Sequence, residues 1–185
     1  MRKRASSGAA RRAGRDLYFV HGISAIDELN DDTKKWAENA KSDGKIRFFG
    51  FSTHRNMEAC MTGAAELGWI DGIMMTYNYR VMHTDAMKRA VDACVKAGIG
   101  LTAMKTQAAF SANFYASVGS ETDDGLKMTQ RLMEKGYTAE QAKLKVVWEH
   151  PNIASICSAM PNMTILQANV AAALNKTKLS LKDRQ

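Results

Sequence analysis

The stretch that decides the fold is Asp16-Leu17-Tyr18-Phe19-Val20-His21-Gly22, an apolar run that ends on a histidine and a glycine. About thirty residues later, Gly50-Phe51-Ser52-Thr53-His54 again places polar side chains behind an apolar run. Short apolar runs at this interval are typical of strands that alternate with helices. The two stretches therefore predict a βα repeat whose chemistry lies at one rim, where parallel strands end.

The same alternation continues along the rest of the chain. Each apolar run is followed by an amphipathic segment, and Gly44, Gly68 and Gly98 are placed to end such segments. The expected strands are 17–20, 46–51, 70–77, 99–105 and 153–157. The expected helices are 31–41, 56–67, 86–96, 138–148 and 164–174. In the first helix we expect Asp31 or Asp32 as the cap, with Trp36 and Ala40 on a buried face.

Strands that are apolar on both faces and alternate with helices form a parallel sheet covered by helices. The sequence therefore predicts an α/β fold. Ligands bind such folds at the carboxyl ends of the strands, which fall near His21, Ser52, Tyr77, Lys105 and Ser158. The alternative for each polar residue is that it merely caps the helix that follows.

Positive charge is concentrated at the amino terminus. Six of the seven net positive charges come from arginines and lysines before Asp16, so residues 16–185 carry only +1. Residues 1–15 are expected to be a basic disordered leader and residues 16–185 a single domain, which argues against a nucleic-acid partner for the folded part. The leader is interpreted as a solvated or artefactual segment, with an RNA-binding arm or part of a transit peptide as alternatives.

Composition and residue spacing also lead to expectations about the cellular compartment and about metal binding. The apolar run after Arg11-Arg12 is too short for a secretory signal, and no stretch is long and apolar enough to cross a membrane. Cys60, Cys94 and Cys157 lack C-x-x-C spacing and are expected to be reduced and mostly buried. No histidine has a metal-binding spacing, and His54 is interpreted as a rim residue or cap. We expect a cytoplasmic protein without a metal site.

Four stretches, in order, resemble consecutive strand motifs of the aldo/keto reductases. They are Asp-Leu-Tyr-Phe-Val-His-Gly from Asp16, Gly-Lys-Ile-Arg-Phe-Phe-Gly-Phe-Ser-Thr-His from Gly44, Met-Met-Thr-Tyr-Asn-Tyr from Met74 and Gly-Ile-Gly-Leu-Thr-Ala-Met-Lys from Gly98. Those enzymes are (β/α)8 barrels that pass hydride from a nicotinamide cofactor to a carbonyl. The resemblance runs from about Asp16 to Leu174 and begins at the family's fourth strand. It implies a partial TIM (β/α)8 barrel, about five parallel strands with flanking helices.

The resemblance implies one member of the family's catalytic tetrad. His21 matches the histidine that orients or polarises the substrate oxygen. The family's aspartate, tyrosine and lysine belong to strands that precede the matched stretch. Because that tyrosine would be the general acid, the chain alone is expected to be inactive unless a complementary amino-terminal half supplies it.

The resemblance implies that more of the family's cofactor-binding residues than of its catalytic residues are present in this chain. Ser52 matches the serine that contacts the nicotinamide carboxamide. The cofactor is expected to be NADP or NAD, because Ala159 and Ile165 replace the cations that usually hold the 2′-phosphate. The implied cofactor contacts are Ser52, Thr53, Tyr77, Lys105, Ser158, Met160, Asn162 and Asn169.

Two functions remain open on the sequence. The first is an aldo/keto reductase-type oxidoreductase that reduces a small carbonyl substrate with NAD(P)H and is present as an incomplete chain. The second is a non-catalytic nucleotide-binding remnant or gene fragment. Between residues 106 and 137, Phe110, Phe114 and Tyr115 would line a substrate pocket or cover a sheet edge. Residues from Asn175 on resemble the start of an extension that carries iron–sulfur clusters in related subfamilies.

Overall fold

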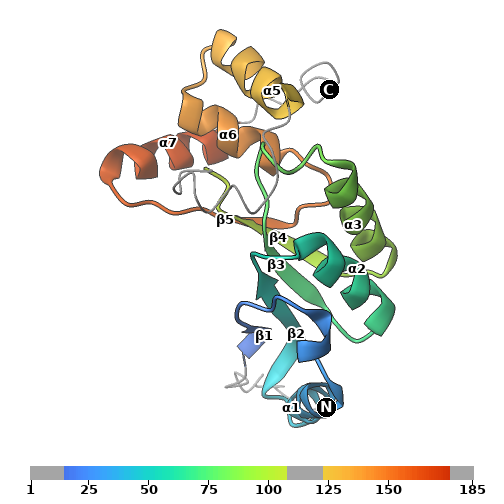
Figure 1. The fold of residues 1–185 in the computed structure, drawn as a ribbon. Helices are drawn as coiled ribbons and strands as arrows, with labels where there is room; N and C mark the ends of the chain where they lie inside the picture. Colours follow the sequence, from blue (N-terminus) through green and yellow to red (C-terminus); the bar gives the residue numbers. More distant parts are fainter. Residues whose placement is uncertain (1–14, 108–122, 176–185) are drawn as a thin grey trace, which may run out of the picture.

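The centre of the fold is one parallel sheet (Figure 1). The computed structural model describes residues 15–107 and 123–175. Within these residues five strands lie side by side in chain order: β1 (Arg15–Val20), β2 (Ile46–Thr53), β3 (Gly72–Thr76), β4 (Gly100–Met104) and β5 (Ser155–Cys157). β1 and β5 are the edges of this open sheet. The prediction of about five parallel strands in a partial barrel is confirmed.

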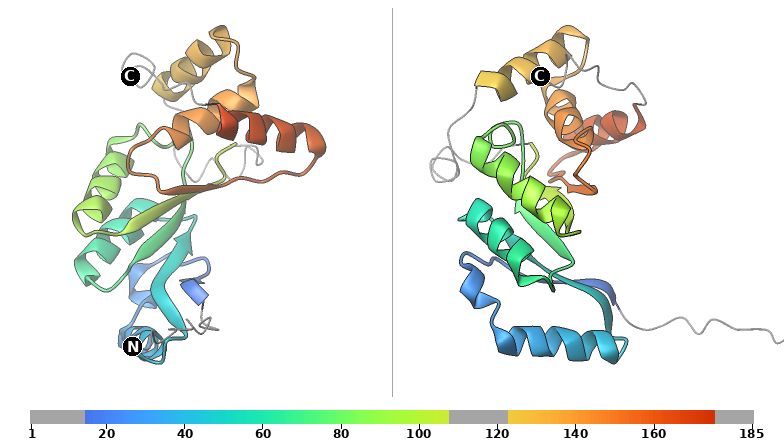
Figure 2. Two further views of the ribbon diagram at one scale, coloured as in Figure 1. Left: turned by 180° about the vertical axis from the view of Figure 1, so that it is seen from behind. Right: turned by 90° about the vertical axis from the view of Figure 1, so that its right-hand side faces the viewer.

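Three helices cover one face of the sheet, as the right-hand view of Figure 2 shows. They are α1 (Asp31–Ser42), α2 (Met57–Leu67) and α3 (Asp85–Lys96), and a short 3-10 turn, η1 (Ile26–Glu28), follows β1. α1 begins after Asn30, whose Oδ1 accepts the Thr33 N–H at 3.0 Å. The expectation of an Asp31 or Asp32 cap was therefore wrong, because the asparagine before them already satisfies that donor.

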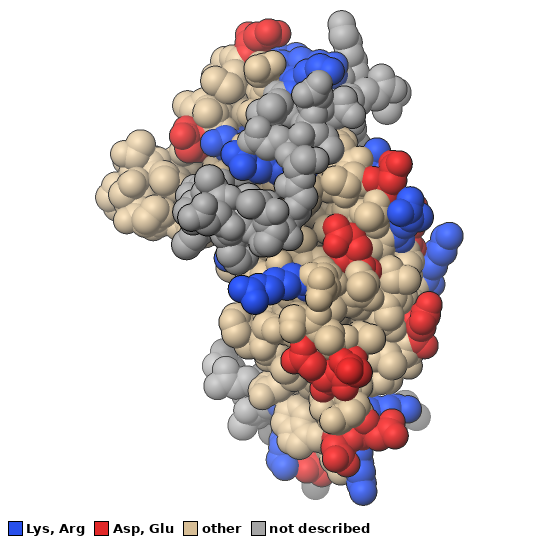
Figure 3. Space-filling view, in the orientation of Figure 1, with Lys and Arg blue, Asp and Glu red and all other residues tan. Residues whose placement is uncertain are grey.

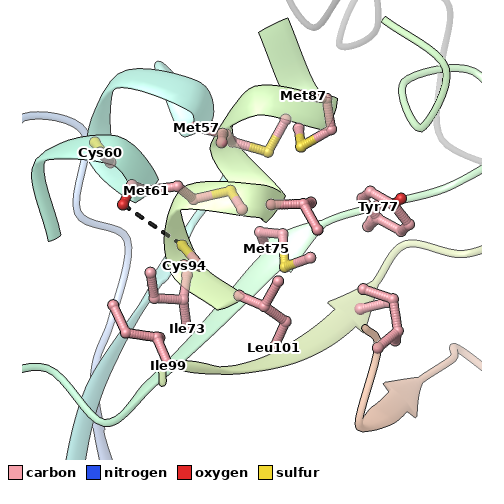
Figure 4. Packing of buried hydrophobic residues seen from close by; sticks show 14 of the residues in the cluster. Met57, Cys60, Met61, Ile73, Met75, Tyr77, Met87, Cys94, Ile99 and Leu101 are labelled. Atoms are coloured by element: carbon pink, nitrogen blue, oxygen red, sulfur yellow. Dashed lines mark hydrogen bonds between the residues drawn. The ribbon is translucent and has the colours of Figure 1, made fainter. Parts of the chain in front are cut away.

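The core lies between this sheet face and the helices. Alternate strand residues point into it, among them Phe49, Phe51, Ile73, Met75 and Leu101, and all five are buried. Figure 4 shows methionines of α2 and α3 packed against several of them. Unbranched methionine side chains suit such irregular gaps, so these residues fill the core.

Cys157 and Trp36 are more exposed than the sequence predicted. Cys60 and Cys94 are buried, and Cys94 Sγ donates to the Met61 carbonyl at 3.5 Å, but Cys157 is exposed. Trp36 is nearly half exposed, although its pattern predicted burial. Its ring packs on Tyr18 of β1 and Phe49 of β2, with ring centroids 5.0 and 6.0 Å away, and no strand of the described residues lies beyond β1 to cover it further.

A second group of helices packs beyond the end of the sheet (Figure 1). It consists of α5 (Asp123–Glu134), α6 (Ala139–Trp148) and α7 (Met163–Leu174). The sequence pattern missed α5. The buried Lys145 Nζ joins two of these helices, since it lies 2.6 Å from Glu149 Oε1 and donates to the Asn175 carbonyl at 3.1 Å.

Several expectations fall outside the described residues. They concern the basic leader through residue 14, Phe110, Phe114 and Tyr115, and the segment 176–185. Among the helices of the described ranges, none has the length and apolar character needed to span a membrane. On the molecular face drawn in Figure 3, acidic and basic side chains are interspersed.

The other sheet face carries the alternate residues. Leu17 and Phe48 are exposed there, and Met74 and Thr102 are half-buried. No helix from residues 15–107 or 123–175 covers this face in the manner of α1 to α3 (Figure 2). Part of it is filled by the Phe19 ring, which lies over Gly50 and Gly72 of the neighbouring strands. Within the described residues, helices therefore pack on one face of the sheet and not on the other.

Candidate functional site

The site begins where β1 and β2 end side by side. Val20 pairs with Phe51 in the register, so His21 and Ser52 emerge next to each other although thirty-one residues separate them. His21 Nδ1 lies 3.2 Å from Ser52 Oγ, which also accepts the Gly22 N–H at 3.0 Å. Gly22 has a φ of 76°, which lets the chain turn sharply just after the histidine. The buried serine thus holds both the exposed imidazole and the turn behind it.

The His21–Ser52 contact allows two arrangements of hydrogens, because either side chain of the pair can be the donor. When the Ser52 hydroxyl donates its hydrogen to Nδ1, the neutral imidazole carries its own hydrogen on Nε2. A donor on Nε2 can hydrogen-bond a carbonyl oxygen and stabilise the negative charge that develops there. The pair is therefore able to orient and polarise a carbonyl group.

A second histidine stands at the same rim. His54 Nδ1 lies 2.9 Å from Thr76 Oγ1 at the end of β3, and its ring centroid is 6.3 Å from that of His21. Burial, followed by the positive charges of Lys105 and His21, lowers the pKa of His54. His54 also lines a cavity of about 250 Å³ together with Gly22, Ile23, Ser24 and Arg55. The interpretation of His54 as a rim residue is consistent with this placement.

We expect the Lys105→Met variant to raise the pKa of His54, because the substitution removes a cation that opposes protonation. An NMR titration of the histidine ring signals measures the change. Lys88→Met, which removes a cation from the exposed side of α3, is the matched control. A His54 pKa that falls, or that both variants shift equally, would contradict the assigned electrostatics.

The pH dependence of folding has a definite sign. Since the pKa of His54 is lowered in the folded state, the unfolded chain binds this proton more readily. The contribution of His54 to stability is therefore present above its ordinary pKa of 6.5 and is lost as the pH falls below that value.

Lys105 is held in an unusual conformation at the end of β4. Its φ is 54°, a left-handed value that costs free energy in a residue other than glycine. The buried Asn78 donates from Nδ2 to the Lys105 carbonyl at 3.2 Å, and its Oδ1 accepts the Arg80 N–H at 3.0 Å. Asn78 thus braces the strand end from which the lysine projects.

Two of the predicted cofactor contacts face away from the rim. Thr53 continues the alternation of Phe49 and Phe51 toward the helices and is fully buried, with its hydroxyl donating to the Arg55 carbonyl at 3.0 Å. Tyr77 is also buried, 5.6 Å from the His150 ring, and burial raises the pKa of its phenol. Both side chains support the rim from behind and present almost no surface to a ligand.

A separate polar cluster joins the ends of β4 and β5 to α7. Gln107 Nε2 donates to Asn169 Oδ1 at 2.9 Å, and Asn169 Nδ2 donates to Ser158 Oγ at 3.3 Å. The family resemblance implied Asn169 and Ser158 as cofactor contacts but did not include Gln107, whose only signal was its position just after a strand. Asn162 caps α7 by accepting the Ile165 N–H at 2.9 Å, and Met160 is exposed beside it.

One further cavity lies apart from the predicted site residues. A cavity of about 310 Å³ opens between α3, α5 and α6, and its lining includes Met82, Met128 and His150 but none of the predicted site residues. Among the described residues, no three His, Cys, Asp or Glu side chains are grouped so that they could hold a metal ion.

Several solved structures have a fold similar to that of this chain. No family model and no curated protein matches the sequence. An aldo-keto reductase from Bacillus halodurans in its apo form matches with a TM-score of 0.69 at 21% identity, over 92% of this chain and 59% of that chain. A thermostable aldo-keto reductase with the inhibitor epalrestat matches at 0.64, with 20% identity and shares of 91% and 57%.

A third match is an aldo-keto reductase from Klebsiella pneumoniae in complex with NADPH, with a TM-score of 0.56, 20% identity and shares of 91% and 55%. The chain thus spans less than two thirds of the length of each of these three structures. Over the part of the barrel that it covers, the chain has the fold of the aldo-keto reductases.

Proposed function

We propose that this chain is the cofactor-binding part of an NAD(P)H-dependent oxidoreductase of the aldo-keto reductase type, acting on a small carbonyl substrate. The observation that carries the proposal is the His21–Ser52 pair at the adjoining ends of β1 and β2. The fold of the matching reductases, one of which holds NADPH, supports the choice of cofactor.

Two buried polar atoms near the strand ends support a bound ligand such as a nicotinamide dinucleotide. Thr106 Oγ1 and Gln107 Oε1 are buried without a hydrogen-bond partner within the described residues. Such groups are costly unless a ligand or another segment satisfies them. The residues proposed to contact the cofactor are Ser52, Lys105, Ser158, Met160 and Asn162. Thr53, Tyr77 and Asn169 are proposed to support these residues from within the fold.

In this proposal the bound cofactor supplies a hydride to the carbonyl carbon. His21 donates a hydrogen bond from Nε2 to the carbonyl oxygen and so stabilises its growing negative charge. When the Ser52 hydroxyl donates to Nδ1, the imidazole is in the tautomer that can do this. The proton that completes the alcohol must come from a stronger acid than a serine-bound neutral imidazole.

A specific observation favours a second candidate, a nucleotide-binding protein without turnover of its own. None of the tyrosines in the described ranges offers an accessible phenol beside His21. Tyr77 and Tyr79 are buried, Tyr18 packs on Trp36, and Tyr137 immediately precedes the α6 cap Thr138. The general acid of the first candidate therefore has to come from outside the described residues.

The test of cofactor binding is a fluorescence titration of the purified chain with NADPH and NADH. We expect weak binding of both, with affinities within tenfold of each other, which is about 1.4 kcal/mol. Ser52→Ala should weaken binding about fivefold, the worth of roughly one hydrogen bond. Ser155→Ala, which removes an exposed hydroxyl bonded to Thr102 in the sheet, is the matched control.

Absence of binding by either nucleotide would refute both candidate functions. A preference for NADPH greater than tenfold would instead contradict the inference that Ala159 and Ile165 leave the 2′-phosphate without a cation partner.

A further inference from the structure

We propose that the cavity between α3, α5 and α6 is a binding site for a small carboxylate that carries one aromatic ring or a branched alkyl group. The cavity encloses about 310 Å³, and residues of all three helices line it. Its lining residues within the described ranges do not include the rim residues His21 and Ser52. The inference therefore goes beyond the proposed function and depends on neither a nucleotide nor a carbonyl substrate.

The volume of the cavity limits the size of its ligand. An apolar cavity of about 150 Å³ holds one benzene molecule, and small-molecule sites in proteins begin at about 300 Å³. At about 310 Å³, this cavity has room for one ring with a short side chain. A nicotinamide dinucleotide is too large for that volume, so the cavity suits a different class of ligand from the rim.

Apolar side chains form much of the lining. Met82, Met128 and Val146 reach the cavity from the loop before α3, from α5 and from α6, and all three are buried. Methionine side chains adapt their shape to a neighbour, and their sulfur atoms make favourable contacts with aromatic rings. This part of the lining therefore favours a ligand with an apolar or aromatic body.

The charges of the lining favour an anion over a cation. Glu149 contributes a carboxylate, but Lys145 Nζ lies 2.6 Å from its Oε1, and the two side chains are only 17% and 5% exposed. This pair is neutral as a unit. Lys88, in the first turn of α3, adds a positive charge to the lining and forms no ion pair with a described residue. A carboxylate is a group that such an ammonium binds well.

His150 lines the cavity at the end of α6 and is held in a fixed position. Its Nδ1 accepts the Asn152 N–H at 3.3 Å, so the neutral ring is a hydrogen-bond donor through Nε2. The Tyr77 ring packs on it edge to face, with 5.6 Å between the centroids. The buried Lys145–Glu149 pair lies at the same end of α6. These contacts make the cavity largely preformed, as ligand sites usually are.

The test is an NMR titration of the full chain with 3-phenylpropionate and with the uncharged 3-phenylpropanamide. The chain contains four histidines, whose ring signals report where each probe binds. We expect 3-phenylpropionate to shift the His150 signals with a dissociation constant of about 1 mM or lower, and to leave those of His21 and His54 unchanged. The amide should bind about fivefold more weakly, because it lacks the charge that Lys88 attracts.

Two variants separate the contribution of charge from that of the apolar lining. Lys88→Met, at an exposed residue, should weaken binding of 3-phenylpropionate about fivefold and leave that of the amide unchanged. Lys96→Met removes a lysine from the last turn of the same helix, outside the cavity lining, and as the matched control should change neither affinity. Val146→Phe fills the cavity and should abolish binding of both probes, with folding verified by circular dichroism.

Three results would overturn the proposal. Lack of saturable binding by both probes would mean that the cavity is closed in solution. Equal affinities of the two probes, or equal effects of Lys88→Met and Lys96→Met, would remove the anion selectivity. Shifts confined to His21 and His54 would place the ligand at the rim. Because Lys88 is exposed, its variant keeps the test decisive even if Val146→Phe does not fold. No nucleotide takes part, so this failure is distinct from failure of the proposed function.

Discussion

Gly50→Ala is expected to destabilise the fold by at least about 3 kcal/mol, because an added methyl group has no space at this point of the sheet. A Cβ built on Gly50 overlaps the Gly72 carbonyl oxygen of the adjacent strand and lies 2.7 Å from Phe19 Cε1. The ring could rotate away, but the backbone oxygen belongs to the β2–β3 pairing and cannot. Urea unfolding followed by circular dichroism measures the loss.

Gly72→Ala is the matched control for this prediction. Gly72 lies in the next strand, and a Cβ there meets nothing closer than 3.6 Å, which is ordinary contact. We expect its cost to stay below about 1 kcal/mol, the usual scale of a tolerated core change. Equal costs for the two variants would show that β2 and β3 do not approach as closely as described.

Carbonyl reduction by the 185-residue chain alone is expected to be indistinguishable from background. Loss of a positioned general acid costs about 10²–10⁴ in rate, before any loss of substrate binding is counted. Activity should return in a complex with a fragment that carries the amino-terminal strands of an aldo-keto reductase and supplies a general acid. Consumption of NADPH in the presence of an aldehyde, followed by absorbance, measures both states.

His21→Ala is then expected to lower turnover of the complex about 100-fold, while complex formation and NADPH affinity remain unchanged. His83→Ala, a substitution in the loop before α3 and outside the rim, serves as the control. Activity that survives His21→Ala would make the histidine a structural residue. Robust turnover by the chain without the added fragment would show that the acid lies within the chain after all.

The local elements were largely predictable because their signals are local. Thr84 and Thr138 cap α3 and α6 with side chains that accept the Met87 and Gln141 N–H groups, and Gly44, Gly68 and Gly98 take the left-handed conformation that ends a helix. The strand order also follows from alternation with helices, since parallel strands joined by such connections usually become neighbours. α5 was missed because its apolar pattern follows a stretch with no comparable signal.

The direction of each site side chain was less predictable. Ser52 and Thr53 are adjacent in the chain, yet one points to the rim beside His21 and the other into the core. Successive side chains of a strand alternate between its two faces, so a shift of one residue in register would exchange their positions. Register is set by pairing with β1 and β3, which is not a property of the β2 sequence alone.

By itself, the sequence determined the repeat of strands and helices, their main stop signals and a rim that carries His21 and Ser52, because each depends on residues within one turn or one strand. Only the tertiary structure decided that Gln107 meets Asn169 across sixty-two residues, that Tyr77 is buried, and that the helices of the described residues cover one sheet face and leave the other without a helix. These features depend on which distant segments pack together, and local propensity does not encode such packing.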